Sequence, residues 1–211
     1  MSGDLGTVKD QSFFISNFRL QNGEVIPTVK IVYETYGRLA ADGRNAVLTT
    51  HGYTSSHHAA GRNPANNNLP GWWDGLIGPG KVIDTEKLFV VSSNMLGSSF
   101  GSTNGASIDP RTGQPYGSDF PAITVRDIVA AQKALLDELG VKHLLAIAGP
   151  SYGGYQAFQW AVAYPDLMDA IVPVVTAPMA QDAERGRKID LQPTWSGTAA
   201  GTTTGEGPKL S

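Results

Sequence analysis

The segment LLAIAGPSYGGYQ, residues 144–156, decides the fold. It begins with a short apolar run typical of a buried strand, and helical character begins after Gly153. Gly149, Ser151 and Gly153 thus occupy the G-x-S-x-G positions of a sharp strand-to-helix turn, in which glycines let neighbouring backbone approach and the helix N-terminus stabilises negative charge. This context predicts that Ser151 is a nucleophile. The alternative is a glycine-rich turn with an incidental serine.

The segments on either side of this turn alternate between helix and strand patterns. Apolar residues recur at helical spacing over residues 125–139, and Thr124 and Asp127 form a capping-box pattern at the start. After the turn, a second helix is expected to end near Pro165, and a strand is expected at 170–177. Strand, helix, strand, helix, strand is the order of a parallel sheet with right-handed crossovers.

The first half of the chain adds further strands before a long irregular segment. Four short apolar runs rich in β-branched and aromatic residues predict strands at residues 13–20, 28–36, 46–50 and 88–93. The first two are separated by Asn22 and Gly23, which predicts an antiparallel hairpin. Residues 54–120 are dense in Gly, Asn, Pro and Ser, and loops this long are usually functional or disordered. We therefore predict an α/β fold with a mostly parallel sheet and an N-terminal antiparallel hairpin.

Domain organisation follows from a change in composition near the C-terminus. Residues 1–178 are predicted to form one core, and residues 179–211 a non-core, disordered tail, because the last twenty residues contain only Trp195 and Leu210 as bulky apolar groups. The sheet is expected to be incomplete at this end. An open edge strand at 170–177 leaves a partner chain, such as a second copy in a homodimer, as an alternative.

Composition excludes several functional classes. A net charge of −3 without a basic stripe argues against nucleic-acid binding and favours a small-molecule substrate. The sequence has no apolar run long enough to span a membrane, and its N-terminus lacks a signal-peptide pattern, which predicts a cytoplasmic protein without membrane association. The absence of cysteine excludes thiol nucleophiles and thiolate metal sites.

Acyl transfer also requires amide donors that stabilise an oxyanion. In a serine site of this kind, one donor is the residue after the nucleophile and another comes from the loop after an earlier strand. The backbone amides of Tyr152 and Tyr53 are predicted to fill these roles. The ring of His51, in the same loop, is expected to be satisfied by backbone rather than to act in catalysis.

The sequence does not supply a general base in the expected order. The acid and the histidine should follow the serine, but His51, His57, His58 and His143 all precede Ser151. His57 and His58 are expected to be a polar loop pair rather than metal ligands, because adjacent side chains point apart and no carboxylate cluster accompanies them. No metal is therefore predicted.

Beyond these motifs, residues 13–178 resemble the homoserine O-acetyltransferase family of α/β-hydrolase-fold enzymes. The resemblance is carried by IVYETYG (31–37), GWWDGLIGPGK (71–81), SSNMLGSSFGST (92–103), YGSDFP (116–121), TVRDIVAAQKALLDELGV (124–141) and the Ser151 turn. It implies transfer of an acetyl group from acetyl-CoA to homoserine through an acyl-Ser151 intermediate, in methionine biosynthesis. It implies no bound cofactor, and acetyl-CoA enters as the acyl donor.

The sequence departs from the family pattern in two ways. It has Gly52-Tyr53-Thr54-Ser55 where the family has Ala-Leu-Thr-Gly, and Pro150 and Tyr152 beside the serine where the family has Gly and Met. Aromatic residues at these positions would reshape the acyl pocket, which leaves a serine esterase or hydrolase as an alternative. The family's lid and its catalytic aspartate and histidine have no counterpart, so the chain is expected to be a truncated member, and a catalytically dead binding fragment is a further alternative.

Overall fold

The computed structural model describes residues 3–177 and contains one six-stranded sheet. Its strands lie in the order β1-β2-β6-β3-β9-β10. They are β1 (Gln11–Arg19), β2 (Val25–Tyr36), β6 (Phe89–Ser93), β3 (Ala46–Thr50), β9 (Leu144–Pro150) and β10 (Met168–Val174). Strands β6, β3, β9 and β10 are mutually parallel, whereas β1, β2 and β6 pair antiparallel. The predicted α/β fold with an N-terminal hairpin is confirmed.

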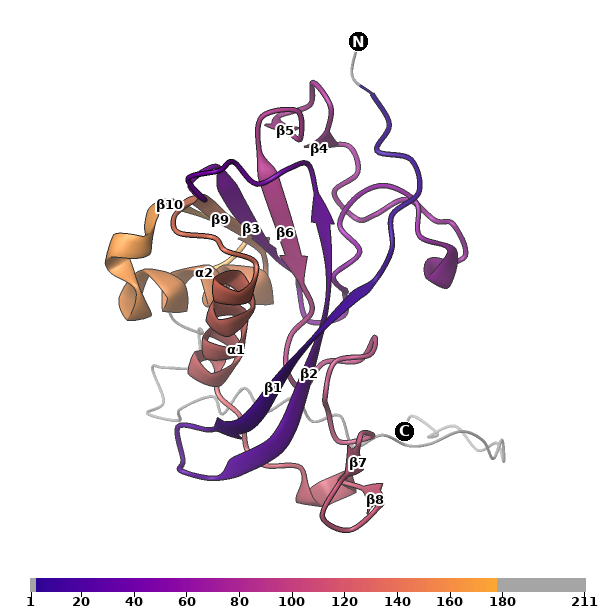
Figure 1. Cartoon of the computed structure of the whole chain (residues 1–211), viewed down its shortest axis with the longest axis vertical. Coiled ribbons are helices and arrows are strands. Elements are labelled where there is room, and N and C mark those ends of the chain that lie inside the picture. Colours follow the sequence, from indigo (N-terminus) through magenta and orange to yellow (C-terminus); the bar gives the residue numbers. More distant parts are fainter. Residues whose placement is uncertain (1–2, 178–211) are drawn as a thin grey trace, which may run out of the picture.

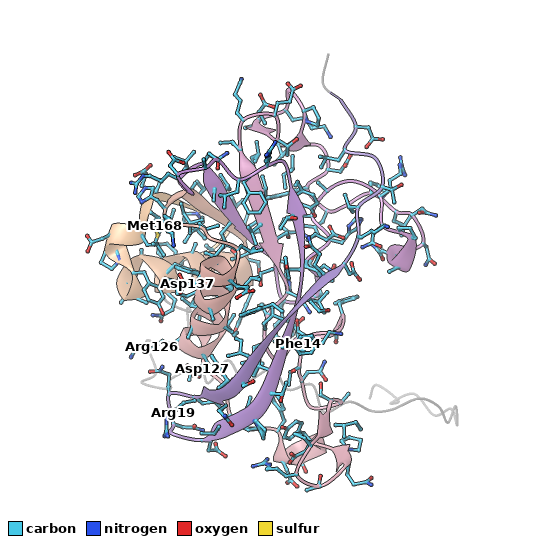
Figure 2. The ribbon with its side chains drawn as sticks, viewed as in Figure 1. Phe14, Arg19, Arg126, Asp127, Asp137 and Met168 are labelled. Carbon is cyan, nitrogen blue, oxygen red and sulfur yellow. The ribbon has the colours of Figure 1, made fainter. Side chains whose placement is uncertain are left out.

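Two helices, α1 (Val125–Glu138) and α2 (Tyr152–Ala163), lie on the same side of this sheet (Figure 1). The predicted capping box is present, because the Thr124 hydroxyl accepts from the Asp127 N–H and the Asp127 carboxylate accepts from the Thr124 N–H. Asp127 also accepts from the Gln21 N–H at 2.8 Å. Figure 2 shows Asp127 at this end of α1, near Arg19 and the turn of the hairpin. The helix start is thus tied to the hairpin.

The hairpin departs from the sequence prediction at three strand boundaries, and two of them belong to β1, which spans Gln11–Arg19 rather than residues 13–20. Strand β2 begins at Val25 rather than at residue 28 and continues through Pro27. The pairing runs from Ser16 opposite Thr28 to Phe18 opposite Ile26, which places Asn17 opposite Pro27. Asn17 has a φ of 53°, a left-handed conformation that asparagine tolerates. The ladder is thus locally irregular at Asn17, opposite a proline that has no N–H to donate.

The segment 54–120 contains short elements that its composition does not reveal. They are η1 (Pro64–Asn66), β4 (Ile77–Gly78), β5 (Ile83–Asp84), β7 (Ile108–Asp109), β8 (Gln114–Pro115) and η2 (Gly117–Asp119), whereas β6 in the same segment matches the strand predicted at 88–93. Ala59, Ala60 and Ile77 of this segment are buried against Tyr36 and Val90. Val91, the neighbour of Val90, packs with the core that includes the helices. Because adjacent strand residues face opposite sides, this segment covers the sheet face away from the helices.

A short 3₁₀ helix, η3 (Pro165–Leu167), lies between α2 and β10. The division into a core at 1–178 and a disordered tail at 179–211 stays a prediction, and the tail lies outside the described residues. No helix within residues 3–177 is long and apolar enough to cross a membrane.

Candidate functional site

Ser151 stands in a strained turn between β9 and α2. Its φ of 52° and ψ of −117° lie outside the conformations that non-glycine residues normally adopt. Its N–H donates to the Val174 carbonyl at the end of β10 at 2.9 Å, and its carbonyl accepts from the Gly154 N–H. The residue is nevertheless exposed. The fold thus holds Ser151 at the carboxyl end of the sheet, accessible to a substrate.

Close backbone approach explains the glycines that flank the serine. A Cβ placed on Gly149 would lie 2.1 Å from Thr50 Oγ1, and one placed on Gly153 would lie 2.1 Å from the Thr50 carbonyl oxygen. The Thr50 hydroxyl also donates to the Gly153 carbonyl at 2.9 Å. The end of β3 therefore packs directly against the turn, and Thr50 is a supporting residue that sequence reasoning missed. A single threonine at a strand end gave no signal of this contact.

The loop after β3 lies beside Ser151, as the sequence predicted for a loop that carries an oxyanion donor. A Cβ placed on Gly52 would stand 3.8 Å from the Ser151 Cβ. The rings of Tyr53 and Tyr152 are 5.9 Å apart between centroids. Tyr152 is the first residue of α2, and the first N–H groups of a helix have no acceptor within the helix. The structure therefore brings Ser151, Tyr53 and Tyr152 together, while the roles of the two amides stay a prediction.

The phenol of Tyr152 is buried beside the serine. Burial, reinforced by the neighbouring Tyr53 ring, raises the pKa of Tyr152 to about 12. Its ring also makes an edge contact with Tyr155 at 6.1 Å between centroids. At neutral pH the phenol keeps its proton, so this side chain cannot remove a proton from Ser151.

His51 is fully buried and has both ring nitrogens engaged. Nδ1 donates to the Gly52 carbonyl at 2.8 Å, and Nε2 accepts from the Met95 N–H at 3.2 Å. The expectation that backbone satisfies this ring is confirmed. Burial is the main cause that lowers the pKa of His51 to about 4. The imidazole is neutral near pH 7 and shapes the loop rather than serving as a base.

A buried amide network lies beneath the site and was not predicted. The Trp160 indole donates to Gln132 Oε1 at 2.8 Å, and Gln132 Nε2 donates to Gln156 Oε1 at 2.7 Å. Gln156 Nε2 in turn donates to the His51 carbonyl at 3.3 Å. The network links α1, α2 and the loop beside Ser151. The sequence signal that could have indicated this network is the presence of glutamines, Gln132 and Gln156, on otherwise apolar helix faces.

The other histidines are also engaged away from Ser151. His57 Nε2 lies 3.0 Å from Asp10 Oδ1, and His58 Nδ1 lies 3.0 Å from Glu34 Oε1. The expectation that no carboxylates accompany this pair is wrong, because Asp10 and Glu34 come from distant positions in the sequence. His143 Nε2 contacts Asp169 at 2.8 Å, at the start of β9. Since seven strand residues span about 23 Å, this pair is remote from Ser151.

Among the described residues, Asp10, Glu34 and His57 could hold a metal ion, because one ligand atom of each lies within 4.8 Å of the others. However, the Asn63 amide nitrogen donates to both Asp10 Oδ1 and Glu34 Oε1. Asn63 Oδ1 accepts from the Ala65 N–H at 2.9 Å, which fixes the amide orientation. An ion would have to displace an amide held by three hydrogen bonds, so the arrangement favours a structural network.

The geometry combines an exposed, conformationally constrained hydroxyl with a nearby loop and a helix N-terminus. Such an arrangement can accept an acyl group and stabilise the negative charge that develops on its carbonyl oxygen. All four histidines of the chain lie within the described residues, and none of them is hydrogen-bonded to Ser151 there.

Comparisons with known proteins agree with this geometry. A family model described as alpha/beta hydrolase fold matches residues 45–205. The homoserine O-acetyltransferase of Moorella thermoacetica is 53% identical over 157 residues, which cover 74% of this chain and 42% of that protein. The crystal structure of homoserine O-acetyltransferase from Bacillus anthracis is 39% identical with a TM-score of 0.78, covering 82% of this chain and 48% of that one.

An esterase is similar to the same extent. The crystal structure of esterase E22 is 41% identical with a TM-score of 0.74, covering 79% of this chain and 47% of that chain. The present chain spans about half the length of the curated relatives it matches. The matched model covers most of the chain and includes the serine turn. The chain therefore belongs to the alpha/beta hydrolase fold family.

Proposed function

We propose that Ser151 is the nucleophile of an acyl-transfer reaction. The observation that carries this proposal is the exposed position of Ser151 between β9 and α2 with a strained, positive-φ backbone. A serine without a constraint would relax to a commoner conformation, since strain of this kind costs on the order of 1–3 kcal/mol. The contacts of Gly149 and Gly153 with Thr50 supply the constraint.

We further propose that the amides of Tyr53 and Tyr152 hold the oxyanion. Support comes from the position of Tyr152 at the start of α2 and from the contact of the Tyr53 loop with Ser151. Two donors directed at one oxygen stabilise the tetrahedral intermediate more than the ground-state carbonyl.

The reaction that we propose is acetyl transfer from acetyl-CoA to homoserine. Ser151 Oγ attacks the thioester carbonyl, the C–S bond breaks, and coenzyme A leaves as the thiol with the serine proton. The hydroxyl of homoserine then attacks the acyl-serine, and its proton returns to Ser151 Oγ as O-acetylhomoserine departs. Similarity to the homoserine O-acetyltransferases supports this substrate pair, with acetyl-CoA as donor rather than bound cofactor.

A serine esterase is the second candidate, and a specific observation favours it. Tyr53 and Tyr152 lie in ring contact beside Ser151, so the neighbourhood of the nucleophile is aromatic. Aromatic walls change which acyl groups and acceptors fit. Similarity to esterase E22 supports the same alternative.

A non-catalytic binding protein is the third candidate. It is favoured by the engagement of all four histidines away from Ser151, because loss of a triad member lowers the rate by several orders of magnitude. The homodimer likewise stays a prediction, and solution mass determination tests it.

Incubation of the chain with acetyl-CoA or with p-nitrophenyl acetate, each with and without homoserine, separates these candidates. A transferase yields O-acetylhomoserine, whereas an esterase releases acetate from p-nitrophenyl acetate whether or not homoserine is present. Both activities should vanish in Ser151→Ala and persist in Ser118→Ala, which changes an exposed serine in η2. Identical product formation by wild type and Ser151→Ala would contradict both enzymatic proposals.

A further inference from the structure

A small cavity lies between the β1–β2 hairpin and the segment that follows β3. Its volume is about 280 Å³, and its lining includes Asp10, Lys30, His57, Asn63 and Phe100. None of these residues contacts Ser151 in the hydrogen bonds or backbone contacts described above. A cavity of this size accommodates a small molecule.

Strand alternation places Lys30 in this cavity. Val29 and Ile31 are fully buried in the core that includes the helices, so Lys30 between them faces the opposite side of the sheet. Val32 faces the same way and also lines the cavity. Lys30 forms no ion pair with any residue from 3 to 177. The hairpin therefore supplies a lysine to the cavity lining whose ammonium group has no ion-pair partner in the described part of the chain.

Asp10 supplies the opposite charge, and only one of its two carboxylate oxygens accepts hydrogen bonds from the described residues. Its Oδ1 accepts from His57 Nε2 and from Asn63 Nδ2, and both of these residues are buried. Within the described part of the chain, Oδ2 receives no hydrogen bond or ion pair. His57 and Asn63 thus fix the carboxylate while leaving one oxygen available. Among residues 3–177, the cavity thus offers an ammonium group without an ion pair and a carboxylate with one oxygen that accepts no hydrogen bond.

Charge complementarity selects the ligand class. A simple anion would be attracted by Lys30 but repelled by Asp10. A simple cation would be attracted by Asp10 but repelled by Lys30. A short molecule with both charges satisfies both groups, and partly buried charges are stable when paired. We propose that this cavity binds a small amino acid as a zwitterion, with its carboxylate at Lys30 and its ammonium group at Asp10.

Titration of the full chain with L-serine, followed by calorimetry, tests this proposal. Ethanolamine and propionate are matched probes that each lack one of the two charges. Each should bind at least about tenfold more weakly than L-serine, because a partner charge is left unpaired. Binding should be unchanged in Ser151→Ala, so the result does not depend on the proposed acyl transfer.

Variants assign the binding to this cavity. Lys30→Met keeps the aliphatic stem and removes a charge that has no ion-pair partner among residues 3–177, so the variant should fold normally. It should bind L-serine at least about tenfold more weakly. Asp10→Asn should weaken binding similarly. Lys142→Met and Asp42→Asn remove exposed charges elsewhere and should bind as wild type does. The proposal would be overturned if L-serine did not bind, or if ethanolamine or propionate bound as tightly as L-serine. It would also be overturned if Lys30→Met bound L-serine as wild type does, or if the two control variants lost as much affinity for L-serine as Lys30→Met.

Discussion

The carbonyl oxygen of Thr50 lies 2.1 Å from the point where Gly153 would carry a Cβ atom. The two residues are also joined by the hydrogen bond from the Thr50 hydroxyl to the Gly153 carbonyl. The end of β3 and the first turn of α2 therefore meet through backbone, and this contact fixes the turn that holds Ser151. No side chain at position 153 can be accommodated without moving one of these elements.

Gly153→Ala should destabilise the fold for this reason. Overpacking against backbone typically costs about 1–3 kcal/mol and sometimes more. Urea denaturation followed by circular dichroism measures the loss. Gly75→Ala is the matched control, because a Cβ there meets nothing within 4 Å. Equal stability of the two variants would show that the packing between β3 and α2 is looser than described.

Gln156→Leu should weaken the link between the helices and the loop beside Ser151. The change removes the hydrogen bonds of Gln156 to the Gln132 amide and to the His51 carbonyl, both of which are buried. Losing the hydrogen bond of a buried polar group lowers the free energy of unfolding by about 1–3 kcal/mol. Gln159→Leu, on the same helix but only partly buried, is the control. A double-mutant cycle with Gln132→Leu should show coupling, whereas additive losses would argue against a network.

The sequence predicted the elements whose signals are local. The Thr124 and Asp127 pair defined the start of α1, and Asn22 with Gly23 marked the hairpin. The glycine spacing around Ser151 located the strand-to-helix turn that the structure contains.

What the sequence missed depends on contacts between distant residues. His58 meets Glu34 across 24 positions, and His57 meets Asp10 across 47. No local pattern indicates which carboxylates will approach a histidine pair once the chain folds. The same holds for Thr50 and Gly153, which are 103 positions apart. The strands β4, β5, β7 and β8 were missed because each is two residues long, which is too short to show a periodic pattern.

Acid should destabilise the protein partly through His51. Its pKa is lowered from 6.5 to about 4 in the folded state, so the neutral ring favours folding above about pH 6.5. That contribution is lost as the pH falls from about 6.5 toward 4, because the unfolded state then binds the proton more readily. The loss is on the order of 3 kcal/mol, since one pKa unit corresponds to about 1.4 kcal/mol.

Urea denaturation of wild type and His51→Gln at several pH values measures this contribution. The variant should be less stable at pH 7 but should lose less stability between pH 6.5 and 4. His143→Gln, which changes a half-buried histidine at the far end of β9, should retain the wild-type pH dependence from His51. Parallel curves for wild type and His51→Gln would show that the ring is not buried as described.

The turn between β9 and α2 should make Ser151 a chemically competent nucleophile. Reaction with a fluorophosphonate probe, followed by peptide mass spectrometry, tests it most directly. We predict a single adduct on Ser151 that is slow to form, absent in Ser151→Ala and retained in Ser118→Ala. No adduct on folded wild-type protein, or equal labelling of Ser151→Ala, would contradict the claim.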